Sequence, residues 1–408
     1  MNLRRTSPGE GHRGTPPRIV YGVTASLSAT LLRGQLGWFR RRGWDVHLVI
    51  SPGDLSTEIA EAEGVTLHPL PMERATSPVS DLLSFIRWVA LLRRLDPDVL
   101  KIATPKAGLL GSLAGWLTGV PVRVYEMWGL RLEGARTPAQ RVVLWLAERL
   151  SVLLATDVVC VSHSLRAAAA ARGLFGRRDR PVVLGHGSSN GVSPERWDAG
   201  FAAVDRGAVR AGWGVDPDDL VVGFVGRLCY DKGVPDLLDA FRALSDLPVA
   251  LVLVGPVEDE ELRARIAELG DRVVHLDMTL DLSPVYVGID VLCLPTRREG
   301  FPNVVLEAAL AEVPSVTTTA TGARDSVVPG ITGWLVETGN VPELAERLRA
   351  CAADRGAIRS AGRAARARAL RDFRPEEIWA GLESIYRGRA VESSARAGVP
   401  AEPVGRTG

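Results

Sequence analysis

Residues 220–234 have the sequence LVVGFVGRLCYDKGV, in which an apolar run is followed at once by glycines and charged residues. Apolar positions with helical spacing then continue to Phe241. A strand that ends at Gly226-Arg227 and a helix that begins near Lys232-Gly233 are typical of a parallel βα unit. The apolar run is continuous rather than alternating, as expected for a strand whose sheet is covered by helices on both faces. This stretch predicts an α/β protein with a parallel sheet.

The same rhythm repeats on both sides of a polar, glycine-rich segment over 185–193. In the front half, strands are expected at 18–23, 45–51, 65–71, 97–104, 122–127, 157–162 and 181–185. In the back half they are expected at 220–228, 249–255, 272–277, 291–296, 314–318 and 333–337. Ligands of open parallel sheets bind beyond the carboxyl ends of the strands, so two facing lobes predict a site in the cleft between them.

The predicted organisation is two Rossmann-like, doubly wound domains. We expect a disordered lead over 1–17, a first domain over 18–192, a second domain over 193–373 and a disordered tail over 389–408. The segment 374–388 is expected to form an amphipathic helix, and the pattern does not identify the domain on which it packs.

The composition is globular, with 24% charged and 46% hydrophobic residues, which excludes a mostly disordered or collagen-like chain. Residues 1–190 hold 24 Lys and Arg against 15 Asp and Glu, a net charge of +9, and the remainder has a net charge of −8. The basic half favours an anionic partner such as a phosphoester acceptor or a membrane surface, and attraction between the two lobes is the alternative. The total charge of +1 gives no support for a nucleic-acid partner.

The four cysteines point to a reducing compartment. They lie far apart, mostly in apolar runs, and are expected to be buried thiols: Cys160, Cys229, Cys293 and Cys351. The N-terminus has no apolar core of a signal peptide, and no run of about 18 apolar residues predicts a membrane-spanning helix. Two Asp-Pro-Asp triplets, at 96–98 and 216–218, imitate a metal-binding pattern but are typical of turns.

The first candidate site cluster is cationic. Arg227 and Lys232 flank glycines where a predicted strand ends and a helix begins. Two cations and free backbone amides at one point suit a diphosphate, and ordinary solvated loop charges are the alternative.

The second cluster is the stretch EGFPNVVLE over 299–307, which follows a predicted strand and opens a helix. Its carboxylates, Glu299 and Glu307, would both face a ligand seated on the helix N-terminus, where they could accept hydrogen bonds from vicinal sugar hydroxyls. Gly300 would allow close approach to the backbone. The alternative is a helix-capping acid followed by a surface acid.

Together the two clusters, Gly-Arg-x₄-Lys-Gly and E-Gly-Phe-Pro-Asn-x₃-E, resemble the donor-binding signature of glycosyltransferase family 4, whose members are retaining enzymes of GT-B architecture. Further stretches resemble the subgroup that extends lipid-linked oligosaccharides for capsule, exopolysaccharide or glycan assembly: TPKAGLLG at 104–111, GLRLE at 129–133, GSSNGV at 187–192 and TGARDS at 321–326. The resemblance covers roughly residues 18 to 388.

The resemblance implies a role for each matching residue. Arg227 and Lys232 would neutralise the donor pyrophosphate, Glu299 would contact the transferred sugar, and Glu307 would hold the nucleotide ribose. Further donor contacts would come from Gly226, Gly300, Phe301, Asn303 and Val304. It also implies front-face transfer in which a dedicated protein base is optional. No metal or other cofactor is expected, since two cations and a helix terminus take the place of Mg²⁺.

Two departures from the family pattern lie in the front half. Where members often have a Gly-Gly pair in the first loop, this chain has VTASLS at 23–28, and Trp128 stands where many members have a histidine. The candidate contacts for the acceptor or the transferred sugar are Ser26, Lys106, Trp128 and Arg131; an acceptor phosphate could bind at Lys106 and Arg131, and ordinary helix-end charge is the alternative. His163 and His186 are minor candidates.

The expected activity is transfer of a hexose or N-acetylhexosamine from a nucleoside diphosphate sugar, with UDP favoured, to a polyprenyl-diphosphate-linked saccharide. The expected location is the cytoplasm, at the inner face of the plasma membrane. The apolar stretch 82–92, with Arg87, Arg93 and Arg94, could bind anionic lipid or pack in the core. Alternatives are a nonhydrolysing UDP-sugar epimerase of the same architecture and a catalytically silent binding subunit.

Overall fold

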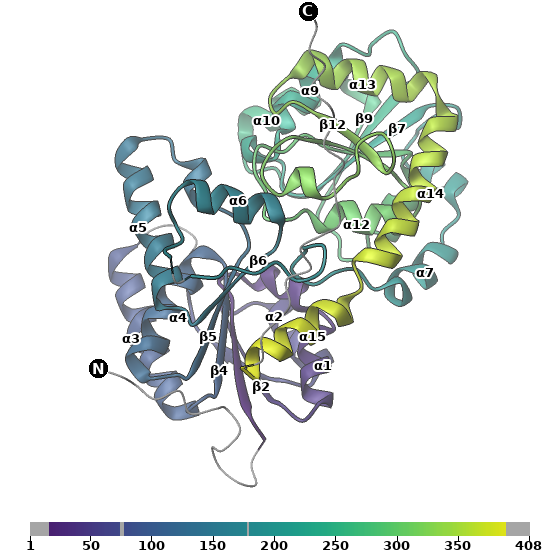
Figure 1. Ribbon diagram of the computed structural model, residues 1–408. Helices are drawn as coiled ribbons and strands as arrows, with labels where there is room; N and C mark the ends of the chain where they lie inside the picture. Colours follow the sequence, from purple (N-terminus) through teal and green to yellow (C-terminus); the bar gives the residue numbers. More distant parts are fainter. Residues whose placement is uncertain (1–15, 74–76, 178, 389–408) are drawn as a thin grey trace, which may run out of the picture.

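The computed structural model describes residues 16–73, 77–177 and 179–388, which form two α/β domains (Figure 1). Each domain has a six-stranded sheet with parallel pairings, in the orders β3-β2-β1-β4-β5-β6 and β12-β11-β10-β7-β8-β9. Both orders are doubly wound: successive strands are added first toward one edge of the sheet and then, from the middle, toward the other edge. The expected fold class is confirmed.

The strands and helices of the first domain follow one another in βα order. The strands are β1 (Arg18–Gly22), β2 (Asp45–Ile50), β3 (Thr66–Pro69), β4 (Val99–Ala103), β5 (Val122–Met127) and β6 (Asp157–Cys160). The helices are η1 (Ser26–Leu32), α1 (Gln35–Arg41), α2 (Asp54–Glu63), α3 (Pro78–Leu95), α4 (Pro105–Thr118), η2 (Arg131–Gly134), α5 (Pro138–Leu154) and α6 (His163–Ala171).

The second domain repeats the arrangement. Its strands are β7 (Leu220–Val225), β8 (Val249–Val254), β9 (Val273–Leu276), β10 (Val291–Leu294), β11 (Ser315–Thr318) and β12 (Gly333–Val336). Its helices are α7 (Pro194–Ala202), α8 (Arg206–Gly212), η3 (Tyr230–Lys232), α9 (Val234–Arg242), α10 (Glu260–Ala267), η4 (Gly270–Arg272), α11 (Ser283–Gly288), α12 (Asn303–Leu310), η5 (Ala323–Asp325), α13 (Val341–Ala353), α14 (Arg355–Asp372) and α15 (Pro375–Tyr386).

The prediction of a strand at 181–185 is wrong. Val182 makes a single bridge with Val159 at the edge of the first sheet. The chain then turns, with the amide of Gly187 bonded to the carbonyl of Leu184 and φ of Gly187 at 107°. The segment therefore leaves the sheet toward the second domain after one pairing.

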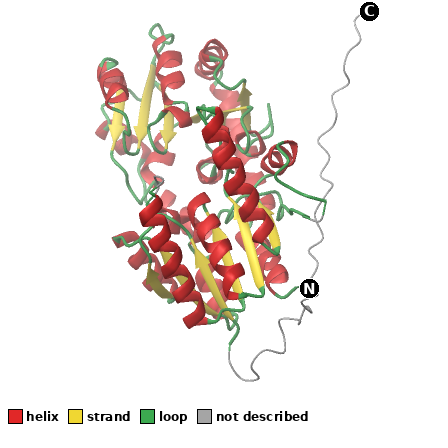
Figure 2. Cartoon of the chain, turned by 90° about the vertical axis from the view of Figure 1, so that its left-hand side faces the viewer, coloured by secondary structure: helices red, strands yellow, loops and turns green. Residues whose placement is uncertain are grey.

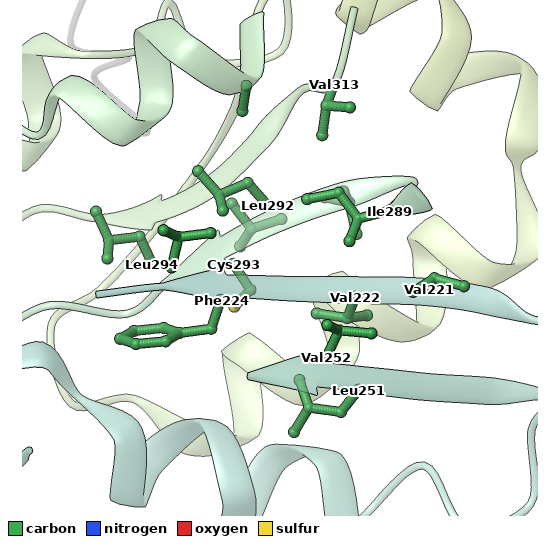
Figure 3. Close-up of a cluster of buried hydrophobic side chains, with 14 of the residues drawn as sticks. Val221, Val222, Phe224, Leu251, Val252, Ile289, Leu292, Cys293, Leu294 and Val313 are labelled. Atoms are coloured by element: carbon green, nitrogen blue, oxygen red, sulfur yellow. The ribbon is translucent and has the colours of Figure 1, made fainter. Parts of the chain in front are cut away.

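Each sheet is buried between helices. One core of the first domain lies under α3, α4 and α6, and the other lies under α1 and α2. In the second domain the core strands carry aliphatic side chains on both faces, as Figure 3 shows for Val221 and Val222 of β7 and Leu292 of β10. Burial on both faces explains the continuous apolar runs of the sequence.

The last described helix, α15, packs on the first domain. Figure 1 shows α14 and α15 running from the second domain back to the first. Ile378, Trp379, Leu382 and Tyr386 belong to the same buried cluster as Phe39 of α1. Burial of aliphatic side chains such as Ile378 and Leu382 stabilises this return by about 2 kcal/mol each. The partner that the sequence left open is thus the first domain.

The four cysteines are free; Cys160, Cys293 and Cys351 are buried, whereas Cys229 is partly exposed. The Asp-Pro-Asp triplet at 216–218 forms a turn in which Asp218 donates its amide to the Asp216 carboxylate at 3.0 Å. Within the described residues, no helix combines the length and hydropathy required to cross a bilayer.

Candidate functional site

A cleft with a volume of about 780 Å³ lies between the two domains. The first domain contributes side chains of η1 and α2, including Leu27, Ser28 and Glu63. The second domain contributes the loops that follow β7 and β10 and the start of α12. Because both loops leave the carboxyl ends of parallel strands, the cleft occupies the position expected for a ligand of this fold.

The cationic residues of the cleft are held by the loop after β7. Gly233 has φ of 71°, and a Cβ at this position would lie 1.9 Å from the carbonyl oxygen of Pro295, so a side chain would collide with the backbone of the β10 loop. This contact brings Lys232 to the second loop, where its Nζ lies 2.5 Å from Oε1 of Glu299. Arg227 lies in the same cleft and pairs with Glu258 at 2.6 Å.

The start of α12 presents backbone amides to the cleft. Its N-cap is Pro302, whose side chain makes no capping hydrogen bond, and Asn303 and Val304 line the cleft. Uncapped amides and the positive end of the helix dipole favour a phosphate or another anion. Asn303 is fixed from the interdomain segment, because Ser188 donates a hydrogen bond to its Oδ1 at 2.8 Å.

Glu307 lies one turn further along α12 and faces the same cleft. The buried hydroxyl of Tyr286 donates a hydrogen bond to Glu307 Oε2 at 2.7 Å. Burial raises the pKa of the Glu307 carboxyl, while the bond from Tyr286 and the charge of Arg196 oppose this rise. One carboxylate oxygen is thus occupied and the other has capacity for a ligand hydroxyl.

The domains touch directly beside these residues. A Cβ on Gly300 would lie 2.3 Å from the carbonyl oxygen of Trp128, so this close approach requires glycine. Ser162 donates a hydrogen bond to the carbonyl of Gly300 at 2.7 Å. Ser164 donates from both its amide and its hydroxyl to Asp325 at 2.8 Å. The loop that carries Glu299 is therefore supported by the first domain.

The second-domain residues that sequence reasoning selected come together. The cleft is lined by Gly226, Arg227, Lys232, Glu299, Phe301, Asn303, Val304 and Glu307, while Gly300 forms the domain contact. Their roles toward a ligand remain predictions.

None of the first-domain candidates is among the described residues that line the cleft, although the backbone of Trp128 contacts Gly300 beside it. Ser26 accepts a hydrogen bond from the amide of Ser56 at 3.0 Å, and Lys106 pairs with Asp81 at 2.5 Å. Trp128 donates its indole N–H to Glu126 at 2.7 Å, and Arg131 lies in η2. The minor candidates His163 and His186 are likewise outside the lining.

Sequence reasoning missed cleft residues of the first domain such as Arg33, which follows η1, and Glu63 of α2. Glu63 accepts hydrogen bonds from the amides of Gly34 and Gly37, at 2.5 and 2.6 Å. The small residues of the first loop could have indicated this side of the cleft, because Ser28 and the neighbouring Leu27 line it.

A buried ion pair supports the Trp128 loop from within the first domain. Lys101 of β4 and Glu126 of β5 are each 1% exposed and lie 2.6 Å apart. Gln35 accepts a hydrogen bond from Lys101 at 3.1 Å, and Glu126 also accepts the indole N–H of Trp128. Asn190, in the segment between the domains, accepts from both Gln35 and Trp379, at 3.2 and 2.7 Å.

Exposed apolar side chains, here together called the apolar face, lie on α3, α4 and α5. Helix α4 packs between α3 and α5, and Figure 2 shows helices of the first domain standing in front of its strands. The apolar face consists of Val79, Leu82, Leu83, Ile86, Trp116, Leu117, Val142, Val143, Leu146, Leu150 and Leu153. Trp88 and Leu92 of α3 are buried, so one side of this helix packs in the core and the other side carries residues of the apolar face.

Two family models match most of the chain. The model "Glycosyl transferase 4-like domain" matches residues 28–187, and the model "Glycosyl transferases group 1" matches residues 219–354. The chain is also 33% identical, over 93% of its length and 99% of the relative's, to the capsular polysaccharide biosynthesis glycosyltransferase CapM of Staphylococcus aureus.

The chain belongs to glycosyltransferase family 4. A more distant relative of this family 4 glycosyltransferase is the UDP-Gal:alpha-D-GlcNAc-diphosphoundecaprenol alpha-1,3-galactosyltransferase of Escherichia coli. That enzyme is 23% identical, over 73% of this chain and 77% of its own. Among solved structures, Anabaena HepE in complex with UDP and glucose superimposes with a TM-score of 0.74. It is 20% identical and covers 90% of this chain and 98% of its own, which supports the GT-B fold of the family 4 glycosyltransferase.

Proposed function

We propose that this glycosyltransferase transfers a hexose or N-acetylhexosamine, with retention of configuration, from a nucleoside diphosphate sugar to a polyprenyl-diphosphate-linked saccharide. The observation that carries the proposal is the Lys232–Glu299 pair beside Arg227 at the start of α12. Cations, helix amides and carboxylates at one point match the phosphates and hydroxyls of such a donor. UDP is favoured as the nucleotide because the E. coli relative and HepE are named with UDP-galactose and UDP.

In the proposed mechanism the donor diphosphate lies between Arg227 and Lys232, which stabilise its charge as the glycosidic bond breaks. Glu299 holds hydroxyls of the sugar, and Glu307 holds those of the ribose. The departing phosphate oxygen accepts the proton of the acceptor hydroxyl, which attacks from the same face, so the configuration is retained. Divalent metal is not required in this scheme, since two cations and the α12 terminus supply the positive charge.

The lipid-linked acceptor is proposed from the relatives and from the apolar face. The E. coli relative is named for a diphosphoundecaprenol substrate, and CapM is named for capsular polysaccharide. Helices α3, α4 and α5 carry two acidic residues, Asp81, which pairs with Lys106, and Glu148, which is buried. Exposed Arg87, Arg93 and Arg94 leave this surface basic, which suits an anionic bilayer.

The proposed location is therefore the inner face of the plasma membrane, with the apolar face on the bilayer and the cleft open to the cytoplasm. Exposed apolar patches that are rimmed by charged residues mark sites of protein or membrane interaction. The arginines beside it favour anionic lipid over a second protein of neutral surface.

The test combines a donor panel with a lipid acceptor. The purified chain is incubated with UDP-, GDP- or ADP-sugars and an undecaprenyl-diphosphate-linked monosaccharide, with EDTA or with Mg²⁺, and products are analysed by mass spectrometry and NMR. We expect one donor to add one sugar to the lipid with retained configuration and in the presence of EDTA. Epimerisation of a donor without acceptor, an inverted product, or activity that requires Mg²⁺ would contradict the corresponding part of the proposal.

A further inference from the structure

A second cavity, of about 670 Å³, lies where α5 and η2 of the first domain meet the loop after β10 of the second. Its polar lining includes Arg141, Arg172, Arg297 and Glu133, and its apolar lining includes Trp145 and Val142. None of these six residues lines the interdomain cleft that holds Arg227 and Lys232. We call this cavity the arginine pocket.

The arginine pocket has an excess of positive charge. Arg172 Nη2 lies 3.0 Å from Glu133 Oε1, and Arg297 donates to both oxygens of Asp236, at 2.8 and 2.7 Å. Arg141 is exposed and has no acidic partner among the described residues. The lining of the pocket therefore contains three guanidinium groups, of which Arg172 and Arg297 are paired with carboxylates and Arg141, on α5, is not paired among the described residues.

Neighbouring residues fix the geometry of the pocket. Trp145 lies one helical turn after Arg141 and donates its indole N–H to the carbonyl of Arg172 at 2.8 Å. Residues four apart on a helix share a face, so Arg141 and Trp145 both reach the pocket. A guanidinium group suits recognition of a phosphate, and the indole adds an apolar surface beside it.

The arginine pocket adjoins the loop that carries Glu299. Arg297 precedes Glu299 by two residues, so their Cα atoms are at most about 7 Å apart. Thr321 connects the two sites, because its hydroxyl donates to Glu133 at 2.8 Å and its carbonyl accepts the amide of Glu299 at 2.9 Å. A sugar attached to a group in the pocket would thus start next to the residues that are proposed to hold the donor sugar.

The pocket also adjoins the apolar face. Val142 belongs to both, and Val143 and Leu146 continue the exposed apolar surface along α5. A ligand with an anionic head and a long hydrocarbon tail could place the head in the pocket and the tail along α5 in the bilayer.

We propose that the arginine pocket binds the diphosphate of the polyprenyl-diphosphate-linked acceptor. This inference rests on the proposed function, and it adds a second phosphate site, separate from the donor site at Arg227 and Lys232. Arg141 can bind the acceptor diphosphate directly, because no carboxylate of the described residues is paired with its guanidinium group.

Direct binding tests the proposal with farnesyl diphosphate as the probe and with farnesol and inorganic pyrophosphate as comparison ligands. Calorimetry is done with the donor cleft saturated by whichever nucleoside diphosphate stabilises the chain. We expect farnesyl diphosphate to bind at least about tenfold more tightly than either comparison ligand, since it alone supplies both the charge and the tail. If farnesol binds as tightly as farnesyl diphosphate, the phosphate contact is contradicted. If pyrophosphate binds as tightly, the lipid assignment is contradicted.

The variants are Arg141→Ala, Arg141→Lys and the control Arg136→Ala. Loss of a charge-assisted hydrogen bond is expected to weaken farnesyl diphosphate about tenfold or more, and lysine is expected to restore part of it. Arg136 is exposed near the start of the same helix and does not line the pocket, so its variant removes the same charge and should bind within twofold of wild type. Unchanged binding by Arg141→Ala would overturn the proposal.

Kinetics separate this inference from the proposed function. With an undecaprenyl-diphosphate-linked acceptor, Arg141→Ala should raise the KM for acceptor at least about tenfold and leave the KM for donor unchanged. If wild type is active and the variant has normal acceptor KM, the pocket assignment fails alone. If wild type transfers sugar to no lipid-linked acceptor, the proposed function fails as well.

Discussion

Lys232 and Glu299 form an ion pair, 2.5 Å long, across two loops that are 67 residues apart in sequence. Both side chains are largely buried, with exposed fractions of 24% and 11%. In the proposed complex the donor replaces this pair, because the diphosphate binds the ammonium group and a sugar hydroxyl binds the carboxylate. The pair fixes the positions of both groups in the cleft.

Replacement of Lys232 by alanine should reduce kcat/KM at least about a hundredfold, since a charge contact to the leaving group is lost in the transition state. The control is Arg263→Ala, which removes an exposed cation of α10 that pairs with Glu260 on the surface. Initial rates over a range of donor concentrations give both constants. A near-normal rate for the Lys232 variant would exclude this residue from the mechanism.

Glu307→Gln should raise the KM for donor about tenfold or more, because a neutral amide group replaces the carboxylate that is proposed to accept hydrogen bonds from the ribose. Tyr286→Phe should have a smaller effect, since it removes only the support of the carboxylate. Glu261→Gln, an exposed residue of α10, is the matched control. Equal donor affinity of the Glu307 variant and the control would show that the ribose is held elsewhere.

Glu148 predicts a pH dependence of stability. Burial beneath η2 raises the pKa of its carboxyl to about 7, although backbone N–H groups of Leu132 and Arg131 oppose the rise. The folded state therefore retains a proton that the unfolded chain has lost above its ordinary pKa of 4.5. The contribution of Glu148 to the free energy of unfolding is therefore fully present below pH 4.5 and falls as the pH rises to about 7. Above that pH it no longer changes.

Glu148→Gln should remove this contribution, which is on the order of a few kcal/mol. Thermal unfolding at pH 5, 6, 7 and 8 compares the two proteins. We expect the variant to gain stability relative to wild type as pH rises from 5 to 7. A difference in melting temperature that is the same at every pH would contradict the shifted titration.

The apolar face predicts binding to vesicles. Val143→Asp together with Leu153→Asp should reduce binding to anionic vesicles at least about tenfold, because two charges enter the apolar layer. The control, Ile331→Asp, alters an equally exposed apolar residue of the second domain. Co-sedimentation with vesicles of mixed phosphatidylglycerol and phosphatidylethanolamine measures both. Binding by the double variant at the control level would place membrane contact on another surface.

The buried pair of Lys101 and Glu126 predicts strong coupling between two substitutions. Lys101→Met leaves Glu126 buried without its cation and should destabilise the protein by about 3–5 kcal/mol. Adding Glu126→Gln removes the isolated charge and keeps an acceptor for the Trp128 indole, so the double variant should recover part of the loss. Chemical denaturation of Lys101→Met, Glu126→Gln and the double variant measures the coupling, and simple additivity of the two single losses would contradict it.

The sequence predicted those features that depend on short segments. Arg227, Lys232, Glu299 and Glu307 lie in two local motifs at strand ends, and the parallel topology brings those ends to one edge of the sheet. The strand at 181–185 was wrong because its apolar residues resemble a strand but turn away after Val182.

Features that depend on contacts between distant segments were not predictable. The first-domain residues of the cleft, such as Arg33, are placed by how the domains face each other. Lys101 and Glu126 are paired by the register of neighbouring strands, where Ala103 lies opposite Glu126. The amphipathic pattern of α15 predicted a buried face but carried no information about which domain covers it.

The central claim is that a nucleoside diphosphate binds with its phosphates between Arg227 and Lys232. A crystal structure of the chain with the nucleoside diphosphate that stabilises it most in a thermal-shift screen tests this directly. We predict phosphate oxygens within hydrogen-bonding distance of both cations and ribose hydroxyls on Glu307. Phosphates bound at another place, with the Lys232–Glu299 pair intact, would contradict the claim.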